Sequence, residues 1–225
     1  MKSKNKIVVI ATHPDDETYG AGGSLMRFKA EGAEIHWLIV TNVHTEHGWS
    51  SEVVVNRQKE IKKVANAFSF DGVYNLNYPT TKLDEISRGN LISVISKVFV
   101  KVKPTHLILP FYGDPHSDHR IAFECAYACT KSFRYPYLKN IWMMGVISET
   151  DFGLPGAQNA FLPNILVDIS NHIDSKINAL KIFKSELGEH PFPRSVSNIK
   201  ALATTRGAQA GCNYAEAFMN VKTII

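Results

Sequence analysis

The sequence contains few cysteines and no long apolar run. Its three cysteines are Cys125, Cys129 and Cys212, and no two of them form a C-x-x-C pair. An odd number of separated thiols argues against a disulfide scaffold and fits a reducing compartment, with Cys125 and Cys129 as core thiols on one helix face. No stretch approaches the roughly 20 apolar residues of a membrane span, and the apolar run before His13 is too short for a signal peptide. We therefore expect a cytoplasmic protein that does not insert into a membrane.

The sequence also lacks a strong excess of one charge, internal repeats and low-complexity tracts. Its 25 Lys and Arg against 21 Asp and Glu give a net charge of +4. The modest basic run of Lys97, Lys101 and Lys103 has no interleaved aromatic residues, so binding of nucleic acid is not expected. The mild positive balance slightly favours an anionic small substrate. With 44% hydrophobic residues the chain can bury a full core, and we expect residues 1–225 to form one domain.

Apolar strands alternate with amphipathic helices along the chain. Ile7–Ile10 is a continuous β-branched run, typical of a strand covered on both faces in a parallel sheet. The alternation predicts a doubly wound α/β fold. Strands are expected at Lys6–Ile10, Ile35–Val40, Val73–Leu76, Thr105–Pro110, Ile141–Ile147, Asn164–Ile169 and Phe218–Ile225. Helices are expected from Asp16 to about Lys29, at Val53–Phe68, Ile86–Val102, Arg120–Ser132 and Ile173–Leu187, and from about Ile199 onward.

Two clusters of histidine and aspartate come after two of these strands. The first is Ala11-Thr12-His13-Pro14-Asp15-Asp16-Glu17, and the second is His116-Ser117-Asp118-His119. In the common strand order 3-2-1-4-5 the first and fourth strands are neighbours where the order reverses, and ligands bind beyond the carboxyl ends of the strands there. Either cluster alone could be a capped turn or a polar helix start. Two clusters at matching strand ends instead predict one divalent metal site with an acid/base group.

The residue types leave several assignments within this site open. A catalytic zinc usually has three protein ligands and one open position. Adjacent carboxylates in a turn point in different directions, so one can bind the metal while the other acts as a general base on water. His116 can flank the same site, and Asp118 can orient one of the neighbouring rings. Four side chains compete for the three ligand positions: His13, Asp15, Asp16 and His119.

At these residues the chain resembles the LmbE-like (PIG-L) de-N-acetylase family. Members carry A-H-P-D-D-E after the first strand and H-x-D-H later; here Thr12 adds one residue between Ala11 and His13. Some members place a tyrosine shortly before H-x-D-H, where this chain has Asp114, with Tyr112 two residues earlier. The resemblance spans almost the whole chain and includes residues 18–25, residues 57–60, Val167–Ser170, Lys176 with Ala179-Leu180, Arg206-Gly207 and Tyr214–Phe218.

The resemblance implies a Rossmann-like fold with a mostly parallel sheet, and a zinc-dependent amidase that removes acetyl groups from amino sugars. It implies zinc ligands at His13, Asp16 and His119, with Asp15 as the general base. The ligand types do not select zinc strongly, so Fe²⁺ or another divalent ion is also compatible with them.

The resemblance also implies roles for residues around the metal. His116 would stabilise the oxyanion, with Asp118 as a partner that raises the pKa of its ring and keeps it charged. Arg57 would contact the substrate, although an ion pair with Glu60 at i+3 explains this arginine equally well. Arg206 is expected to pack structurally.

Other function classes fit less well. Gly20, Gly22 and Gly23 follow the first strand, but their spacing fails G-x-G-x-x-G and the nearby carboxylates would repel a pyrophosphate. A non-catalytic metal-binding or regulatory protein on the same scaffold remains the alternative. The loops at 41–51, with His44 and His47 as rim contacts, and at 149–163, as a lid, are expected to border the substrate. The substrate conjugate, for example one of surface-polysaccharide or thiol-sugar biosynthesis, and the oligomeric state, a homo-oligomer included, stay open.

Overall fold

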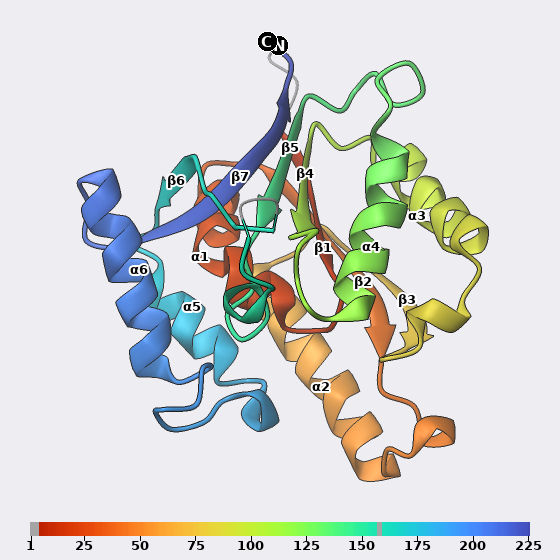
Figure 1. The fold of residues 1–225 in the computed structure, drawn as a ribbon, viewed down its shortest axis with the longest axis horizontal. Helices are drawn as coiled ribbons and strands as arrows, with labels where there is room; N and C mark the ends of the chain where they lie inside the picture. Colours follow the sequence, from red (N-terminus) through yellow and green to blue (C-terminus); the bar gives the residue numbers. More distant parts are fainter. Residues whose placement is uncertain (1–4, 157–158) are drawn as a thin grey trace.

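The computed structural model of the protein describes residues 5–156 and 159–225 and contains one seven-stranded sheet (Figure 1). The strand order is β3-β2-β1-β4-β5-β7-β6, so the expected order 3-2-1-4-5 is confirmed for the first five strands. Strands β1 to β5 are parallel, and β7 is antiparallel to both β5 and β6. The predicted mostly parallel α/β fold is confirmed. The strands are β1 (Lys6–Ala11), β2 (Glu34–Asn42), β3 (Gly72–Pro79), β4 (His106–Pro110), β5 (Asn140–Met144), β6 (Ile165–Asp168) and β7 (Ala215–Thr223).

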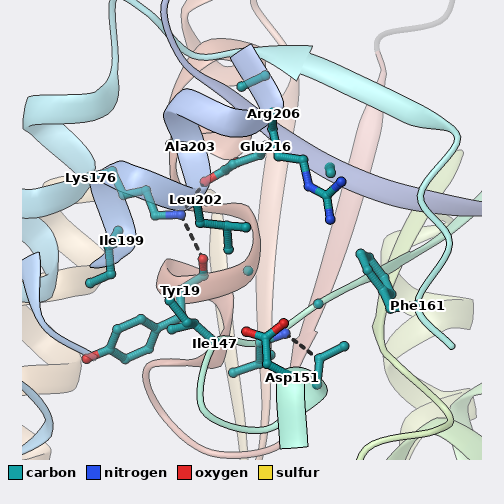
Figure 2. Close-up of a pocket in the computed structure, with 16 residues that line it drawn as sticks. Tyr19, Ile147, Asp151, Phe161, Lys176, Ile199, Leu202, Ala203, Arg206 and Glu216 are labelled. Atoms are coloured by element: carbon teal, nitrogen blue, oxygen red, sulfur yellow. Dashed lines mark hydrogen bonds and ion pairs between the residues drawn. The ribbon is translucent and has the colours of Figure 1, made fainter. Parts of the chain in front are cut away.

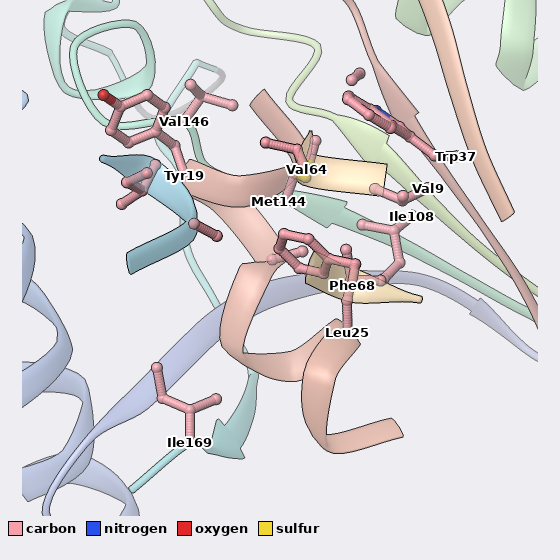
Figure 3. Close-up of a cluster of buried hydrophobic side chains, with 14 of the residues drawn as sticks. Val9, Tyr19, Leu25, Trp37, Val64, Phe68, Ile108, Met144, Val146 and Ile169 are labelled. Carbon is pink, nitrogen blue, oxygen red and sulfur yellow. The ribbon is translucent and has the colours of Figure 1, made fainter. Parts of the chain in front are cut away.

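Each face of the sheet packs on its own layer of helices, because side chains alternate along a strand. In β1, Val9 belongs to one buried cluster and Val8 to the other. The first cluster joins the sheet to α1, α2, α5 and α6, and in Figure 3 Leu25 and Phe68 lie beside Val9 of the sheet. The second joins it to α3 and α4. The helices are α1 (Asp16–Ala30), α2 (Ser51–Phe68), α3 (Arg88–Val102), α4 (Ser117–Tyr127), α5 (Ile173–Leu180) and α6 (Val196–Ala210).

Side-chain caps move several helix starts ahead of the predicted positions. The side chain of Ser50 accepts a hydrogen bond from the backbone of Val53, so α2 begins at Ser51 and not at Val53. Ser195 caps α6 in the same way, so that helix begins at Val196 and not near Ile199. Helix α3 begins at Arg88, two residues later than predicted. Capping residues act before the apolar period starts, which is why periodicity misplaced the starts of α2 and α6; α3 has no side-chain capping hydrogen bond.

Two predicted helices are also too long at their carboxyl ends. The expected helix Ile173–Leu187 stops at Leu180, since the next bonds are of the tighter i→i+3 type, from Ile182 to Ala179 and from Phe183 to Leu180. This turn buries Phe183 completely. Helix α4 begins at Ser117 and ends at Tyr127, and a short 3₁₀ turn, Ala128–Thr130, takes the place of its predicted last turn.

The strands differ from prediction mainly at the sheet edges and at β5. Strand β5 stops at Met144, which pairs with Phe218, and not at Ile147, because the backbone N–H of Val146 bonds the side chain of Thr150. Strand β7 starts at Ala215 because it also pairs with β6. Edge strand β3 runs from Gly72 to Pro79, and its alternating exposure hid its full length from a search for apolar runs.

The predicted burial of Cys125 and Cys129 is confirmed, but only Cys125 lies in α4, because Cys129 falls in the 3₁₀ turn that follows it. Cys125 and Cys129 are buried in the second cluster, and all three thiols are free. Within residues 5–156 and 159–225, no helix combines the length and the apolar content needed to cross a bilayer.

Candidate metal centre and active site

The two histidine/aspartate clusters meet at the centre of the sheet. Strands β1 and β4 are paired in parallel, so the segments that leave their carboxyl ends lie side by side. His13 and Asp16 follow β1, and His119 lies in the first turn of α4. The convergence of segments about a hundred residues apart, which strand order alone predicted, is confirmed.

Three ligand atoms in this convergence form a small triangle. His119 Nε2 lies 3.3 Å from His13 Nδ1 and 3.3 Å from Asp16 Oδ2, and His13 Nδ1 lies 3.8 Å from Asp16 Oδ2. A tetrahedral Zn²⁺ with ligands at about 2.0–2.2 Å separates its donor atoms by about 3.3–3.6 Å. The three side chains therefore fit a divalent ion in type and spacing. Asp16 and His119 are buried, while the side chain of His13 is 20% exposed, so the triangle opens on one side.

Hydrogen bonds hold two of the three candidate ligands in place. Asp114 Oδ2 lies 2.8 Å from His119 Nδ1, and Asp114 Oδ1 accepts a 2.7 Å hydrogen bond from the hydroxyl of Thr150. The backbone of His13 donates to Asp16 Oδ2 at 2.8 Å. Burial opposes protonation of His119, but Asp16 and Asp114 outweigh it and raise the pKa of His119 to about 9. Burial likewise acts against ionised Asp16, while His119 and His13 lower its pKa below the ordinary value.

Asp15 lies in the turn between the candidate ligands His13 and Asp16, lines the same cavity as His13 and has an unusual backbone conformation. Its φ angle is 147°, and its carbonyl accepts hydrogen bonds from the backbones of Thr18 and Tyr19 in the first turn of α1. Such a conformation is costly for a non-glycine residue and recurs at functional sites. The carboxylate lies 3.2 Å from Arg194 Nη1. Burial, and then the charge of Asp16, raise the pKa of Asp15 well above its usual range.

The expected pairing of Asp118 with the ring of His116 is wrong. The backbone N–H of Asp118 donates to His116 Nδ1 at 3.1 Å, and this contact caps α4. The Asp118 carboxylate instead accepts from the backbones of Thr81 at 2.6 Å and Leu83 at 3.1 Å, and lies 3.4 Å from His13 Nε2. Burial lowers the pKa of His116 to about 4, so the expectation of a charged ring is corrected as well.

A second set of ligand types lies next to the first and shares one residue with it. His13, His116 and Asp118 also bring their ligand atoms close together. Asp118 already accepts two backbone hydrogen bonds, whereas Asp16, in the first set, accepts one. The triangle of His13, Asp16 and His119 is therefore the better candidate for the ion.

Arg57 is buried and contacts several protein groups. It donates to the carbonyl of Pro14 at 2.9 Å, is ion-paired with Glu186, and its Nε lies 3.2 Å from Glu60 Oε2. The i+3 ion pair that the sequence suggested is therefore present. The guanidinium also supports the turn between His13 and Asp15, because Pro14 lies between them.

Sequence reasoning missed Arg194, which contacts the site from the segment before α6. It reaches Asp15, lies 2.8 Å from Glu186 Oε2 and 3.6 Å from Glu149 Oε1, and bonds the Ser148 hydroxyl at 2.8 Å. These partners come from segments more than 35 residues away, apart from Glu186, so no local spacing reveals them. A proline-rich loop, with Pro191 and Pro193 before Arg194, was the one local feature.

An open cavity of about 720 Å³ adjoins the triangle. The loop after β2 contributes Thr41–Val43 and Trp49 to its lining, while the expected rim residues His44 and His47 are not among them. His44 instead bonds the carbonyl of Asn77 at 3.0 Å. The cavity contains both signs of charge. Its charged and catalytic-type lining residues are His13, Asp15, Arg57, His116, Glu149, Glu186 and Arg194.

The fold and the site together define a Rossmann-like protein with a candidate His/Asp/His metal centre at the switch point of its sheet. Residues 8–130 match the family model PIG-L, described as GlcNAc-PI de-N-acetylase. The chain belongs to the PIG-L family, and the resemblance read from its two motifs is confirmed.

Individual relatives agree with this assignment. A diacetylchitobiose deacetylase of Thermococcus kodakarensis is 24% identical over 94% of this chain and 81% of its own. Among solved structures, an N,N'-diacetylchitobiose deacetylase from Pyrococcus horikoshii superposes with a TM-score of 0.77 at 22% identity, over 98% of this chain and 85% of that one. A 4-carboxy-2-hydroxymuconate hydratase from Pseudomonas putida has a TM-score of 0.74 at 18% identity, over 98% of both chains. The fold therefore occurs with more than one chemistry.

Proposed function

We propose that this protein is a metal-dependent hydrolase that removes the N-acetyl group from an amino-sugar conjugate, with His13, Asp16 and His119 as the zinc ligands. The observation that carries the proposal is the ligand triangle with Asp15 beside it at the mouth of a polar cavity. Fe²⁺ is a second candidate ion for the same ligand set. Membership of a de-N-acetylase family supports amide hydrolysis as the reaction.

Asp15 and His116 divide the acid/base work in the proposed mechanism. When bound, a divalent ion polarises the amide carbonyl and lowers the pKa of a water molecule. Asp15 accepts the proton of the attacking water and returns it to the leaving amine. His116 acts as a neutral hydrogen-bond donor to the oxyanion: its pKa of about 4 leaves the ring uncharged at pH 7, and its Nδ1 already accepts from Asp118.

Two supporting roles complete the proposal. The carboxylate of Asp118 orients the His13 ring by its contact with His13 Nε2. Arg57 supports the Pro14 turn rather than binding an anionic substrate group. Both arginines of the cavity are already paired with Glu186, which gives no support to the anionic conjugate that net charge suggested. A neutral N-acetylglucosaminyl or chitobiose-like conjugate suits this cavity better, and two relatives are named for such neutral substrates, although another is named for an anionic malate conjugate.

A deacetylation screen with chelator controls tests the proposal. Metal-loaded protein is incubated with N-acetylglucosamine, diacetylchitobiose and N-acetylglucosaminyl-malate, and released acetate and free amine are quantified together. We expect equal amounts of both products from at least one substrate, and none after treatment with chelator. A protein that binds metal and sugar without releasing acetate would instead be the non-catalytic alternative, and hydration of an unsaturated acid without acetate release would place it with the hydratase. The cytoplasmic location stays a prediction, which cell fractionation tests.

A further inference from the structure

A second cavity, of about 600 Å³ including its mouth, lies on the other side of the first turns of α1 (Figure 2). Its walls come from Tyr19 and Gly20 of α1, from the segment Gly145–Asp151, from α6 and from the start of β7. It shares no lining residue with the cavity at the metal triangle. The proposed deacetylation uses none of its side chains.

The innermost charges of this cavity are already satisfied by the protein. Lys176 Nζ donates to the carbonyl of Tyr19 and to Glu216, both at 2.7 Å. Glu216 in turn accepts from the backbones of Gly23 at 2.9 Å and Ser24 at 2.7 Å. This buried pair is therefore part of the scaffold of α1, and its charges are already compensated by the protein.

Two other charged side chains face the cavity without such partners. In Figure 2, the carboxylate of Asp151 and the guanidinium of Arg206 point toward one another across the open space. Within the described residues, Asp151 has no hydrogen bond or ion pair, and Arg206 has a single bond, from Nη1 to Gln209 at 3.1 Å. The two groups are not ion-paired with each other. Burial raises the pKa of Asp151, and the positive charge of Arg206 acts in the opposite direction.

The surface between these two charges is mainly apolar. Ile147, Phe161, Ile199 and Leu202 line it, and Leu202 remains 39% exposed although it faces the cavity. Concave, mostly apolar sites with a few convergent polar groups are typical of small-molecule binding sites. A guanidinium binds a carboxylate through two parallel hydrogen bonds, and a carboxylate in a partly dry site favours an ammonium group.

We propose that this cavity binds a small zwitterion with an apolar side chain, such as an α-amino acid, with its carboxylate on Arg206 and its ammonium group on Asp151. A simple carboxylate would meet the charge of Asp151, and a simple amine that of Arg206, so only a ligand with both charges matches both walls. The apolar side chain of the ligand packs against Leu202, Ile199 and Phe161.

The cavity lies close to the metal triangle but is separate from it. Thr150 lines the cavity, and its hydroxyl bonds Asp114, which bonds His119. Tyr19 lines it as well, and Arg194, which contacts Asp15, lies over the Tyr19 ring at 5.3 Å. A bound zwitterion is therefore not expected to compete with an amino-sugar substrate for binding.

Calorimetric titration of the full chain tests the proposal with leucine and phenylalanine as probes. Isocaproate and isoamylamine, which carry one charge each, serve as matched half-ligands. We expect saturable binding of an amino acid to the wild-type chain. The affinity should be about tenfold or more lower for both half-ligands, and the affinity for the amino acid should fall by a similar factor in Arg206→Gln and in Asp151→Asn. Gln209→Ala, which removes the one partner of Arg206 outside the cavity, is the matched control and should bind normally.

Three results would overturn the proposal. One is the absence of saturable binding by any zwitterion to protein whose thermal unfolding is normal. Another is unchanged affinity in both charge variants. The third is displacement of the amino acid by diacetylchitobiose, which would assign the cavity to the sugar site. None of these measurements requires deacetylase activity, so the proposal and the proposed function can fail independently.

Discussion

At the scale of single residues, the site is built from side chains that restrain one another. Asp114 orients His119, Asp118 orients His13, and Arg194 holds Asp15. His119, His13 and Asp15 thus each have a charged partner that limits the rotation of the side chain. Such partners commonly tune metal affinity and basicity.

The Asp15→Asn variant should separate metal binding from proton transfer. Asparagine tolerates positive φ and keeps the shape of the side chain, but it cannot accept a proton. We expect full metal occupancy by elemental analysis and a loss of about 10²–10⁴-fold in kcat, which is typical of a general base. Wild-type turnover by a metal-loaded variant would exclude Asp15 from this role.

The Asp114→Asn variant should weaken the metal centre without touching a candidate ligand. The change removes the negative charge beside His119 Nδ1, so the ring becomes a poorer ligand. We expect metal affinity to fall about 10–100-fold, measured by competition with a chromophoric chelator. Glu85→Gln, at a surface ion pair with Lys82, is the control and should bind metal normally.

At the scale of secondary-structure elements, α1 and β4 position several residues of the site. Helix α1 presents Asp15 and Asp16 at its amino end, and its middle is held by the buried Lys176–Glu216 pair. Strand β4 is buried along its whole length and precedes the loop with Asp114. The position of the ligands therefore depends on contacts well outside the motifs.

The Lys176→Met variant should destabilise the protein strongly, because it leaves Glu216 buried without its cation. Removal of one partner from a buried pair costs about 3–5 kcal/mol, against about 0–1 kcal/mol for an exposed pair. Lys200→Met, which breaks the exposed pair with Asp174, is the matched control. Free energies of unfolding from urea titration measure both. Equal losses in the two variants would contradict the structural role of the buried pair.

His106 in β4 should make the protein sensitive to acid. Burial lowers the pKa of this ring from 6.5 to about 3, so the folded state keeps it neutral while the unfolded state binds a proton. Its contribution to stability is present above pH 6.5 and is lost as the pH falls from 6.5 toward 3, by at most about 1.4 kcal/mol per pH unit.

The His106→Phe variant removes this protonation site, so its free energy of unfolding should depend less steeply on pH. Unfolding of both metal-free proteins by urea between pH 4 and 7 gives the comparison. Parallel curves for the two proteins would show that His106 does not take up a proton on unfolding.

At the scale of the whole molecule, the candidate metal centre brings together two distant parts of the chain at the edge of the sheet. The triangle joins the segment after β1 to that after β4. An ion that binds only the folded state adds about 2.7 kcal/mol of stability at a hundred times its dissociation constant. We expect zinc to raise the Tm of the chelator-treated protein, measured by calorimetry, and to have no such effect on His13→Ala. An equal shift in that variant would place the ion elsewhere.

Much of the fold could be predicted from local sequence patterns. The buried run of β1, the alternation of strands and helices, and the two motifs after β1 and β4 led to the correct sheet order and to the meeting of His13 with His119. Helix ends were misplaced where Ser50 or Ser195 provided a cap, because a capping side chain acts outside the apolar period.

The sequence by itself determined that histidine and aspartate gather at two strand ends, since residue types and their spacing depend only on the local chain; it left four side chains in competition for three ligand positions, and the family resemblance implied His13, Asp16 and His119. Only the tertiary structure decided which carboxylate serves which histidine. Asp118 bonds His13 and not its neighbour His116, Asp114 bonds His119, and Arg194 reaches Asp15 across 179 positions. Such choices depend on which backbone donors and charges the packed loops bring within about 3 Å, a short-range condition that no sequence separation encodes.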